Sequence, residues 1–305
     1  MPTPDWPALD WPTFEPTFTA LHMRLQIVGK TVLMLTPLQN HWWNITLRVT
    51  PRGLITPPLP IPNAPGQIFQ VAFDLRAHEL IITPSNAEPI TLPLRAQSVS
   101  SFFADYKSAL ASLNIPVTIH PMPVELAAPI RFDLDTKEAP YDRPTVEAFH
   151  QILIHADTIF RRFATGFLGK ISPVHLFWGA ADLCVTRFSG RPASGPPRPD
   201  PMQQEAYSHE VISAGFWPGN GGLGYPAFYA YAAPNPPALA TAGISPGSYN
   251  PALGEFILAY EEARTAPDPT QHILNFLQST YSAAADAAAW PRTALERPMQ
   301  SAPIA

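Results

Sequence analysis

The chain has 305 residues, of which 46% are hydrophobic, so it can bury a sizeable core in one large domain or two smaller ones. A formal net charge of −5 without a basic stripe argues against nucleic acid as a partner. No apolar run approaches about 18 residues, and no signal-peptide pattern is present. A single cysteine excludes an intramolecular disulfide, which fits a reducing compartment. From these features together we expect a cytoplasmic protein without a membrane segment.

Residues 1–116 show the pattern of one α+β unit. Apolar residues spaced three and four apart from Phe14 to Leu25 predict a first helix that ends near Gly29-Lys30. A proline-rich loop at 51–65 interrupts the strand pattern, and an amphipathic helix is expected at 98–113. Five strands are predicted between the two helices, at 31–35, 42–50, 68–74, 79–83 and 90–94.

Residues 145–290 repeat this order of elements. A helix begins around Pro144 and presents one broad apolar face, and a closing helix begins at Asp268-Pro269 and ends near 289. Five strands are expected between them, at 172–178, 182–188, 207–214, 227–232 and 255–261. Residues 117–144 form a connector with one more strand at 117–120, and 291–305 are expected to be a flexible tail.

The two units share a short sequence as well as an order. Residues 27–30, Ile-Val-Gly-Lys, resemble residues 167–170, Phe-Leu-Gly-Lys, at a separation of 140. Short loops between consecutive strands favour antiparallel pairing. We therefore predict an α+β fold with antiparallel sheets, helices packed on one face, and two pseudo-equivalent halves that pack as one globular unit. Identity between the halves is low, so duplication is a hypothesis.

The segment 172–191 combines the apolar density of buried strands with ionisable side chains. Burying such groups without partners costs roughly 2–7 kcal/mol each, so they need partners or a function. His175 and Asp182 lie on neighbouring strands of a tight hairpin and could form an oriented general base. The alternative is a hydrogen-bonded pair that locks the hairpin.

Arg187 and Arg191 flank a turn at Ser189-Gly190. Two guanidinium groups in this position suit a small anionic ligand that carries a carboxylate or a phosphate. The alternative is that each arginine forms an ion pair with a neighbouring strand.

Two further strands carry candidate residues. On a strand at 42–50, Trp42, Asn44 and Arg48 share one face, as they would in a ligand-facing wall. On the strand at 207–214, His209 is a candidate base, and Glu210, on the opposite face, is a candidate binding residue. In both places a solvent-exposed strand face is the simpler alternative. Trp178 and Trp217 are expected to add aromatic walls to the same pocket.

The sequence assigns no metal and no cofactor. It lacks the His-Glu-x-x-His and Cys-x-x-Cys patterns of common zinc sites. Residues 219–224 match Gly-x-Gly-x-x-Gly formally, but a dinucleotide fingerprint needs a strand before it and a helix after it. Here Trp217-Pro218 precedes and Tyr225-Pro226 follows, which predicts a loop.

Several segments together resemble a bacterial family known only as domain of unknown function 5996. The resemblance extends from about Trp11 to Trp290. It implies a family-wide fold and no particular activity. The matching segments are 26–30, 40–43, 172–179, 182–183, 186–191, 207–210, 215–219 and 254–258.

Two functions remain open at this point. The first is a small-molecule-binding protein, which could also be an enzyme, with a His/Asp/Arg pocket in the second half. The second is a non-catalytic interaction module that presents rigid proline- and aromatic-rich loops at 51–65, 192–202 and 217–251. The sequence does not fix the oligomeric state.

Overall fold

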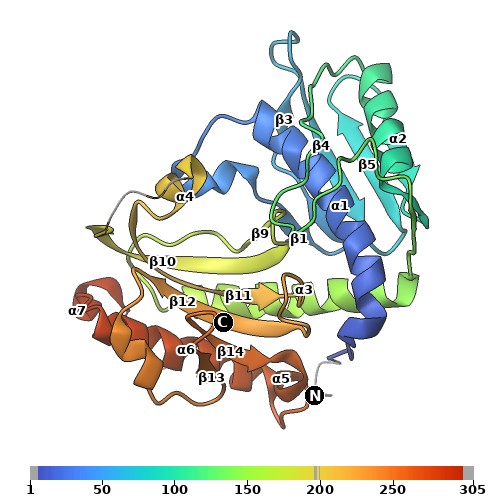
Figure 1. The fold of residues 1–305 in the computed structure, drawn as a ribbon. Coiled ribbons are helices and arrows are strands. Elements are labelled where there is room, and N and C mark those ends of the chain that lie inside the picture. Colours follow the sequence, from blue (N-terminus) through green and yellow to red (C-terminus); the bar gives the residue numbers. More distant parts are fainter. Residues whose placement is uncertain (1–5, 196–197, 199, 298–305) are drawn as a thin grey trace, which may run out of the picture.

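The computed structural model describes residues 6–195, 198 and 200–297, which form two six-stranded antiparallel sheets and their covering helices (Figure 1). The predicted α+β class is therefore confirmed. The first sheet contains β1 (Arg48–Thr50), β2 (Gly53–Ile55), β3 (Leu59–Pro60), β4 (Ile68–Asp74), β5 (Glu79–Pro84) and β6 (Ile90–Pro93). The second contains β9 (His175–Phe177), β10 (Asp182–Pro192), β11 (His209–Trp217), β12 (Ala227–Ala233), β13 (Ser248–Asn250) and β14 (Glu255–Ala259).

The first sheet has one buried face because its strands alternate apolar and polar residues. The strand order is β1-β2-β4-β5-β6, with β3 paired to β4. Phe69, Val71 and Phe73 of β4 are buried, as are Leu80 and Ile82 of β5. The long helix α1 (Trp11–Leu35) and helix α2 (Val99–Ser112) pack with this sheet.

The second sheet has the order β13-β14-β12-β11-β10-β9. Helices α3 (Arg143–Ala164) and α6 (Pro269–Ala287) pack against one of its faces, and Figure 1 shows α6 below the strands. Asp142 and Asp268 cap these helices by accepting bonds from the Thr145 and Gln271 N–H groups, in line with the predicted starts. The opposite face of the sheet is left for other elements to cover.

The two sheets meet where β1 approaches β9. Leu47 and Leu176 exchange two backbone hydrogen bonds of 2.9 Å, and Arg48 Nη1 donates to the Val174 carbonyl at 2.7 Å. Most buried apolar residues of both sheets accordingly belong to one continuous core. The proposed duplication of the halves stays a prediction.

The predicted strand at 31–35 is wrong, because α1 continues through these residues to Leu35. Gly29 is not a helix stop: a Cβ there would lie 2.2 Å from Cγ of Trp178, so glycine lets this ring pack against the helix. Thr36 caps the end of the helix, because its N–H and hydroxyl both donate to the Val32 carbonyl, and Pro37 follows.

The predicted strand at 42–50 is correct only at its end. Residues Asn40–Ile45 form a 3₁₀ segment, η1, in which His41 and Trp42 have φ of 58° and 62°. This left-handed conformation is unfavourable for residues with a side chain, so neighbouring contacts must hold it. As a result, the expected alternation of faces along 42–48 does not occur.

The remaining segments are short. Residues 117–120, predicted as a strand, contain no regular element, while β7 (Gln97–Ser98) pairs with β8 (Glu138–Ala139). Residues 291–297 of the predicted tail include α7 (Arg292–Leu295), and the Leu295 carbonyl accepts a bond of 2.7 Å from the Leu168 N–H. Residues 298–305 lie outside the described part. Helices α4 (Pro201–Ala206) and α5 (Tyr260–Arg264) and η2 (Pro237–Thr241) complete the fold.

Candidate functional site

A cavity of about 780 Å³ lies on the face of the second sheet that α3 and α6 do not cover. Its floor consists of β10, β11, β12 and β14. The connector around Glu125, the C-terminal part of α1, η1 and α4 provide its walls and roof. Figure 1 shows α4 beside the segment that follows α1, above the strands of this sheet. The volume is typical of small-molecule sites.

Strand register places polar groups side by side on the cavity floor. Asp182, Cys184 and Thr186 alternate along β10 and therefore share one face. Thr186 pairs with Ser213 of β11, and their hydroxyls are 2.9 Å apart. Ser213 in turn pairs with Tyr231 of β12. The Cys184 thiol is held protonated because burial raises its pKa well above the usual value.

A glycine lets the phenol of Tyr229 reach Asp182 across an intervening strand. Tyr229 of β12 pairs with Gly215 of β11, which pairs with Cys184 of β10. A Cβ on Gly215 would lie 2.5 Å from the Tyr229 hydroxyl, so a side chain would block the ring. The hydroxyl donates a hydrogen bond to the Asp182 carboxyl.

Three carboxyl groups of the cavity have raised pKa values. Burial raises the pKa of Asp182 to about 6, although the bond from Tyr229 lowers it. Burial and the charge of Asp182 together raise the pKa of Glu255 and of Glu125 to about 7. Glu125 is exposed at the mouth of the cavity, where solvent screening weakens the influence of burial and of Asp182 on its pKa. Ionisation is therefore more costly at Asp182 and Glu255, which are half-buried.

The wall opposite the sheet carries one lysine. Lys30 lies on α1 directly after Gly29, and it is only 5% exposed. Its Nζ is 5.9 Å from the centre of the Trp178 ring, which Gly29 seats against the helix. Burial lowers the pKa of Lys30. Among the described residues no carboxylate forms an ion pair with it.

The roof is held by a histidine in the strained η1 segment. His41 Nδ1 is 3.1 Å and 3.2 Å from the carbonyl oxygens of Ala206 and Glu205, so this nitrogen carries the proton and donates. Nε2 accepts from Lys170 Nζ at 2.6 Å. The backbone N–H of His41 also donates to the Glu205 carboxylate at 3.2 Å. These bonds connect η1 to α4 and explain how the left-handed backbone is maintained.

Four of the predicted site residues line this cavity, namely Trp42, Trp178, Asp182 and Trp217. The Trp217 indole N–H donates to Asn220 Oδ1 at 2.8 Å, and Asn220 donates to the Ala180 carbonyl at 3.1 Å. This bond fixes the Trp217 ring against the loop after β11. Three tryptophans from different elements thus line one cavity, and their role in binding stays a prediction.

His175 does not meet Asp182. The register pairs Asp182 with Phe177 and Cys184 with His175, so the two candidates are separated along the hairpin. His175 is fully buried and packs against Trp43 and Phe177. Burial, with a smaller contribution from Arg48, lowers its pKa to about 3. A neutral imidazole at this depth is part of the core and cannot serve as the expected base.

Asn44 and Arg48 hold the structure together and do not line the cavity. Asn44 accepts from the Gln39 N–H at 3.1 Å and donates to the Thr36 hydroxyl at 2.9 Å, which connects η1 to the end of α1. Arg48 bonds Val174 at the junction of the two sheets.

Arg187 points to the opposite face of the sheet. It is 2% exposed, and its Nη2 donates to the Phe163 carbonyl at 2.6 Å. Its guanidinium carbon lies 3.6 Å from the Phe163 ring centre and 4.1 Å from that of Tyr281. This cation–π environment is in the core between β10, α3 and α6, so Arg187 cannot contact a ligand in the cavity.

The other three candidates do not line the cavity. Arg191 forms an ion pair of 2.7 Å with Glu210 and donates to the carbonyls of Ala288 and Ala289 at the end of α6. The imidazole of His209 contacts the Ser208 hydroxyl at 3.1 Å. Arg191, Glu210 and His209 therefore do not converge with Asp182, and neither arginine supports the anionic ligand that their spacing indicated.

Sequence reasoning did not identify Lys30, Glu125, Tyr229 and Glu255 as site residues. Glu255 could have been found, because it begins the alternation Glu255, Ile257 and Ala259 along a strand. Lys30 was noted only as part of a repeated Gly-Lys pair. Glu125 lies in a connector without periodicity. The place of Tyr229 in the site depends on the strand register that pairs it with Gly215.

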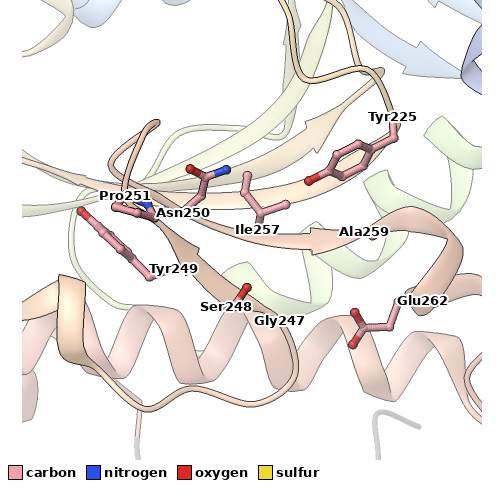
Figure 2. A pocket seen from close by; sticks show the side chains of 9 residues that line it. All are labelled: Tyr225, Gly247, Ser248, Tyr249, Asn250, Pro251, Ile257, Ala259 and Glu262. Atoms are coloured by element: carbon pink, nitrogen blue, oxygen red, sulfur yellow. The ribbon is translucent and has the colours of Figure 1, made fainter.

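A second hollow of about 530 Å³ lies at the outer edge of the same sheet (Figure 2). Ser248 and Asn250 of β13, Tyr225 and Glu262 surround it. Glu262 is exposed and lies 3.5 Å from His272, so its charge already has a neighbour. This hollow presents no buried ionisable group, and we do not assign it a function.

Among the described residues, no three His, Cys, Asp or Glu side chains are arranged to hold a metal ion. No helix within the same residues combines the length and apolar character that crossing a bilayer requires.

Fold and site together define an α+β protein with an aromatic-walled cavity that carries carboxyl groups. The chain belongs to a family of unknown function, DUF5996, whose model matches residues 6–297. The resemblance inferred from the sequence segments is thus confirmed. No curated protein and no solved structure matched the chain.

Proposed function

We propose that the protein binds a small organic molecule in the cavity between the second sheet and the η1–α4 roof. The observation that supports this most is the pair Asp182 and Glu255, which face the cavity with raised pKa values and have no cationic partner among the described residues. Ionisable groups kept in such surroundings are costly, and they concentrate at functional sites.

The alternative of a non-catalytic interaction module has less support. It expected the aromatic residues of the loops to form an exposed patch. Trp217, at the start of the 217–251 segment, instead lines the cavity and is bonded to Asn220. Trp42 and Trp178 also line the cavity.

Acid–base catalysis is a second candidate function for the same cavity. Asp182 has a pKa of about 6, close to neutrality, and a fixed hydrogen bond from Tyr229 orients its carboxyl. A general acid or base works best when its pKa lies near the operating pH. If a reaction occurs, Asp182 is the residue that we expect to transfer the proton.

The binding proposal is tested by blocking the cavity. Thr186→Trp places a large ring on the floor, and Thr83→Trp places the same ring on the exposed face of β5 as a matched control. A library of several hundred small molecules is screened for an increase in melting temperature. Compounds should stabilise the native protein and the Thr83→Trp variant and fail to stabilise Thr186→Trp. Equal responses of both variants, or no stabilising compound for the native protein, would contradict the proposal.

A further inference from the structure

We propose that the ligand is a zwitterion, with a cationic group at Asp182 and Glu255, an anionic group at Lys30, and an aromatic or apolar body between them. This inference rests on the proposed function, because it names the class of molecule that the same cavity binds.

Lys30 is the first independent observation. Lys30 lines the cavity, and the residue as a whole is 5% exposed. Within the residues that the structure describes, it makes no hydrogen bond and no ion pair, and its one polar contact is with the face of Trp178. An ammonium group on a buried residue without a paired anion is costly, and a ligand carboxylate can supply the missing anion.

The carboxyl groups are the second observation. The Asp182 carboxyl accepts from Tyr229, whereas Glu255 makes no side-chain hydrogen bond that we find in residues 6–195, 198 and 200–297. Neither carboxyl forms an ion pair with Lys30, although all three groups line one cavity. Opposite charges that stay apart in one cavity leave room for a ligand that pairs with both.

The walls between these charges are mostly aromatic. Phe177, Trp178, Trp217 and Tyr229 line the cavity, and the rings of Tyr229 and Tyr231 stack at a distance of 6.0 Å between centres. Such walls favour an apolar or aromatic body, and their faces attract a cationic group. The cavity volume of about 780 Å³ exceeds what a single-ring molecule fills, so an aromatic amino acid or a dipeptide can enter.

A ligand with only one kind of charge fits less well. A purely anionic ligand would face Asp182, Glu255 and, at the mouth, Glu125, and would be repelled. The arginines that would favour it, Arg187 and Arg191, do not line the cavity. A purely cationic ligand would leave Lys30 buried and without a partner.

Four related indoles test the charge pattern. L-tryptophan carries both charges, tryptamine only the amine, indole-3-propionate only the carboxylate, and tryptophol neither. Their dissociation constants are measured by titration calorimetry at pH 7.5 on the full chain. We expect L-tryptophan to bind at least about tenfold more tightly than each of the other three, the ratio that one additional charge-assisted pair of about 1.4 kcal/mol produces.

Two variants assign each end of the ligand. Lys30→Met should remove the preference for L-tryptophan over tryptamine and leave tryptamine binding within about twofold. Asp182→Asn should remove the preference for L-tryptophan over indole-3-propionate. Lys137→Met and Asp105→Asn, both at exposed positions, serve as matched controls and should change neither ratio.

Two outcomes would overturn the inference. One is a singly charged or neutral indole that binds as tightly as L-tryptophan. The other is that none of the four indoles binds. The cavity-blocking screen is independent of these probes, so a positive screen with either outcome would retain the binding proposal and reject only the zwitterion.

Discussion

At the scale of single residues, two glycines shape the cavity by leaving space for aromatic rings. Gly29 permits the Trp178 ring to pack on α1, and Gly215 permits Tyr229 to cross β11 toward Asp182. At both positions, the ring of another residue occupies the space that a side chain would need. A sequence shows the glycine but not the ring that approaches it, which is why Gly29-Lys30 was interpreted as a helix end.

Gly29→Ala should destabilise the protein because the new methyl group would collide with Trp178. Overpacking of this kind typically costs about 1–3 kcal/mol. Urea denaturation measures the free energy of unfolding. Gly243→Ala is the matched control, since a Cβ there meets nothing within 4 Å. An unchanged stability of Gly29→Ala would show that Trp178 can move away at no cost.

The raised pKa values predict how stability depends on pH. Asp182 has its pKa raised from 3.8 to about 6, so it favours the folded state fully below pH 3.8 and this contribution is lost as pH rises through about 6. The pKa of Glu255 is raised from 4.5 to about 7, so its contribution to stability is likewise lost as pH rises through about 7. The melting temperature of the ligand-free protein should therefore fall by a few degrees more than that of Asp182→Asn between pH 4 and pH 8. Asp105→Asn should follow the native profile, and parallel profiles for all three proteins would contradict the prediction.

At the scale of elements, helices with capping residues and strands with regular alternation of apolar and polar residues were predictable. Conformations that depend on tertiary contacts were not. The strand β4 occupies the predicted residues 68–74, and α3 begins at its Asp142 cap. The strand predicted across 42–50 failed at its start because η1 adopts left-handed angles that contacts with α4 and Lys170 stabilise. Those contacts come from residues more than a hundred positions away, so no local pattern could reveal them.

The η1–α4 roof should loosen when its lysine is removed. Lys170→Met eliminates the bond to His41 Nε2, while the bonds from His41 to the end of α4 remain. Amide hydrogen exchange of residues 201–207 should accelerate by about tenfold, corresponding to roughly 1.4 kcal/mol of local opening. Amides of β11 should not change, and Lys137→Met should behave like the native protein. Faster exchange throughout the sheet would indicate a general loss of stability instead.

At the scale of the whole molecule, the sequence predicted the α+β class and the antiparallel strands, and it grouped Asp182, Trp178 and Trp217 of the second half with Trp42 of the first. It did not predict that Lys30 and His41 of the first half, and Glu125 of the connector, line the same cavity. The candidate site therefore depends on how the halves pack, which patterns within each half cannot show.

The junction of the sheets should make the two halves unfold together. Arg48→Met removes the bond to Val174 and leaves a buried carbonyl without this donor, at a cost of about 1–3 kcal/mol. Thermal unfolding should show one transition at a lower temperature. Arg131→Met, on the surface, is the control and should unfold as the native protein does. Two separate transitions in the native protein would show that the halves are independent.

The contact between β1 and β9 also affects how molecules meet one another. Each of these strands would otherwise present unpaired backbone groups, which can recruit strands of other chains. Their mutual bonds at Leu47 and Leu176 occupy part of that edge. The outer edges of the path are then β6, which has four residues and ends in Pro93, and β13, which has three. Short or proline-containing edges are poor templates, so we expect the way the sheets join to disfavour aggregation.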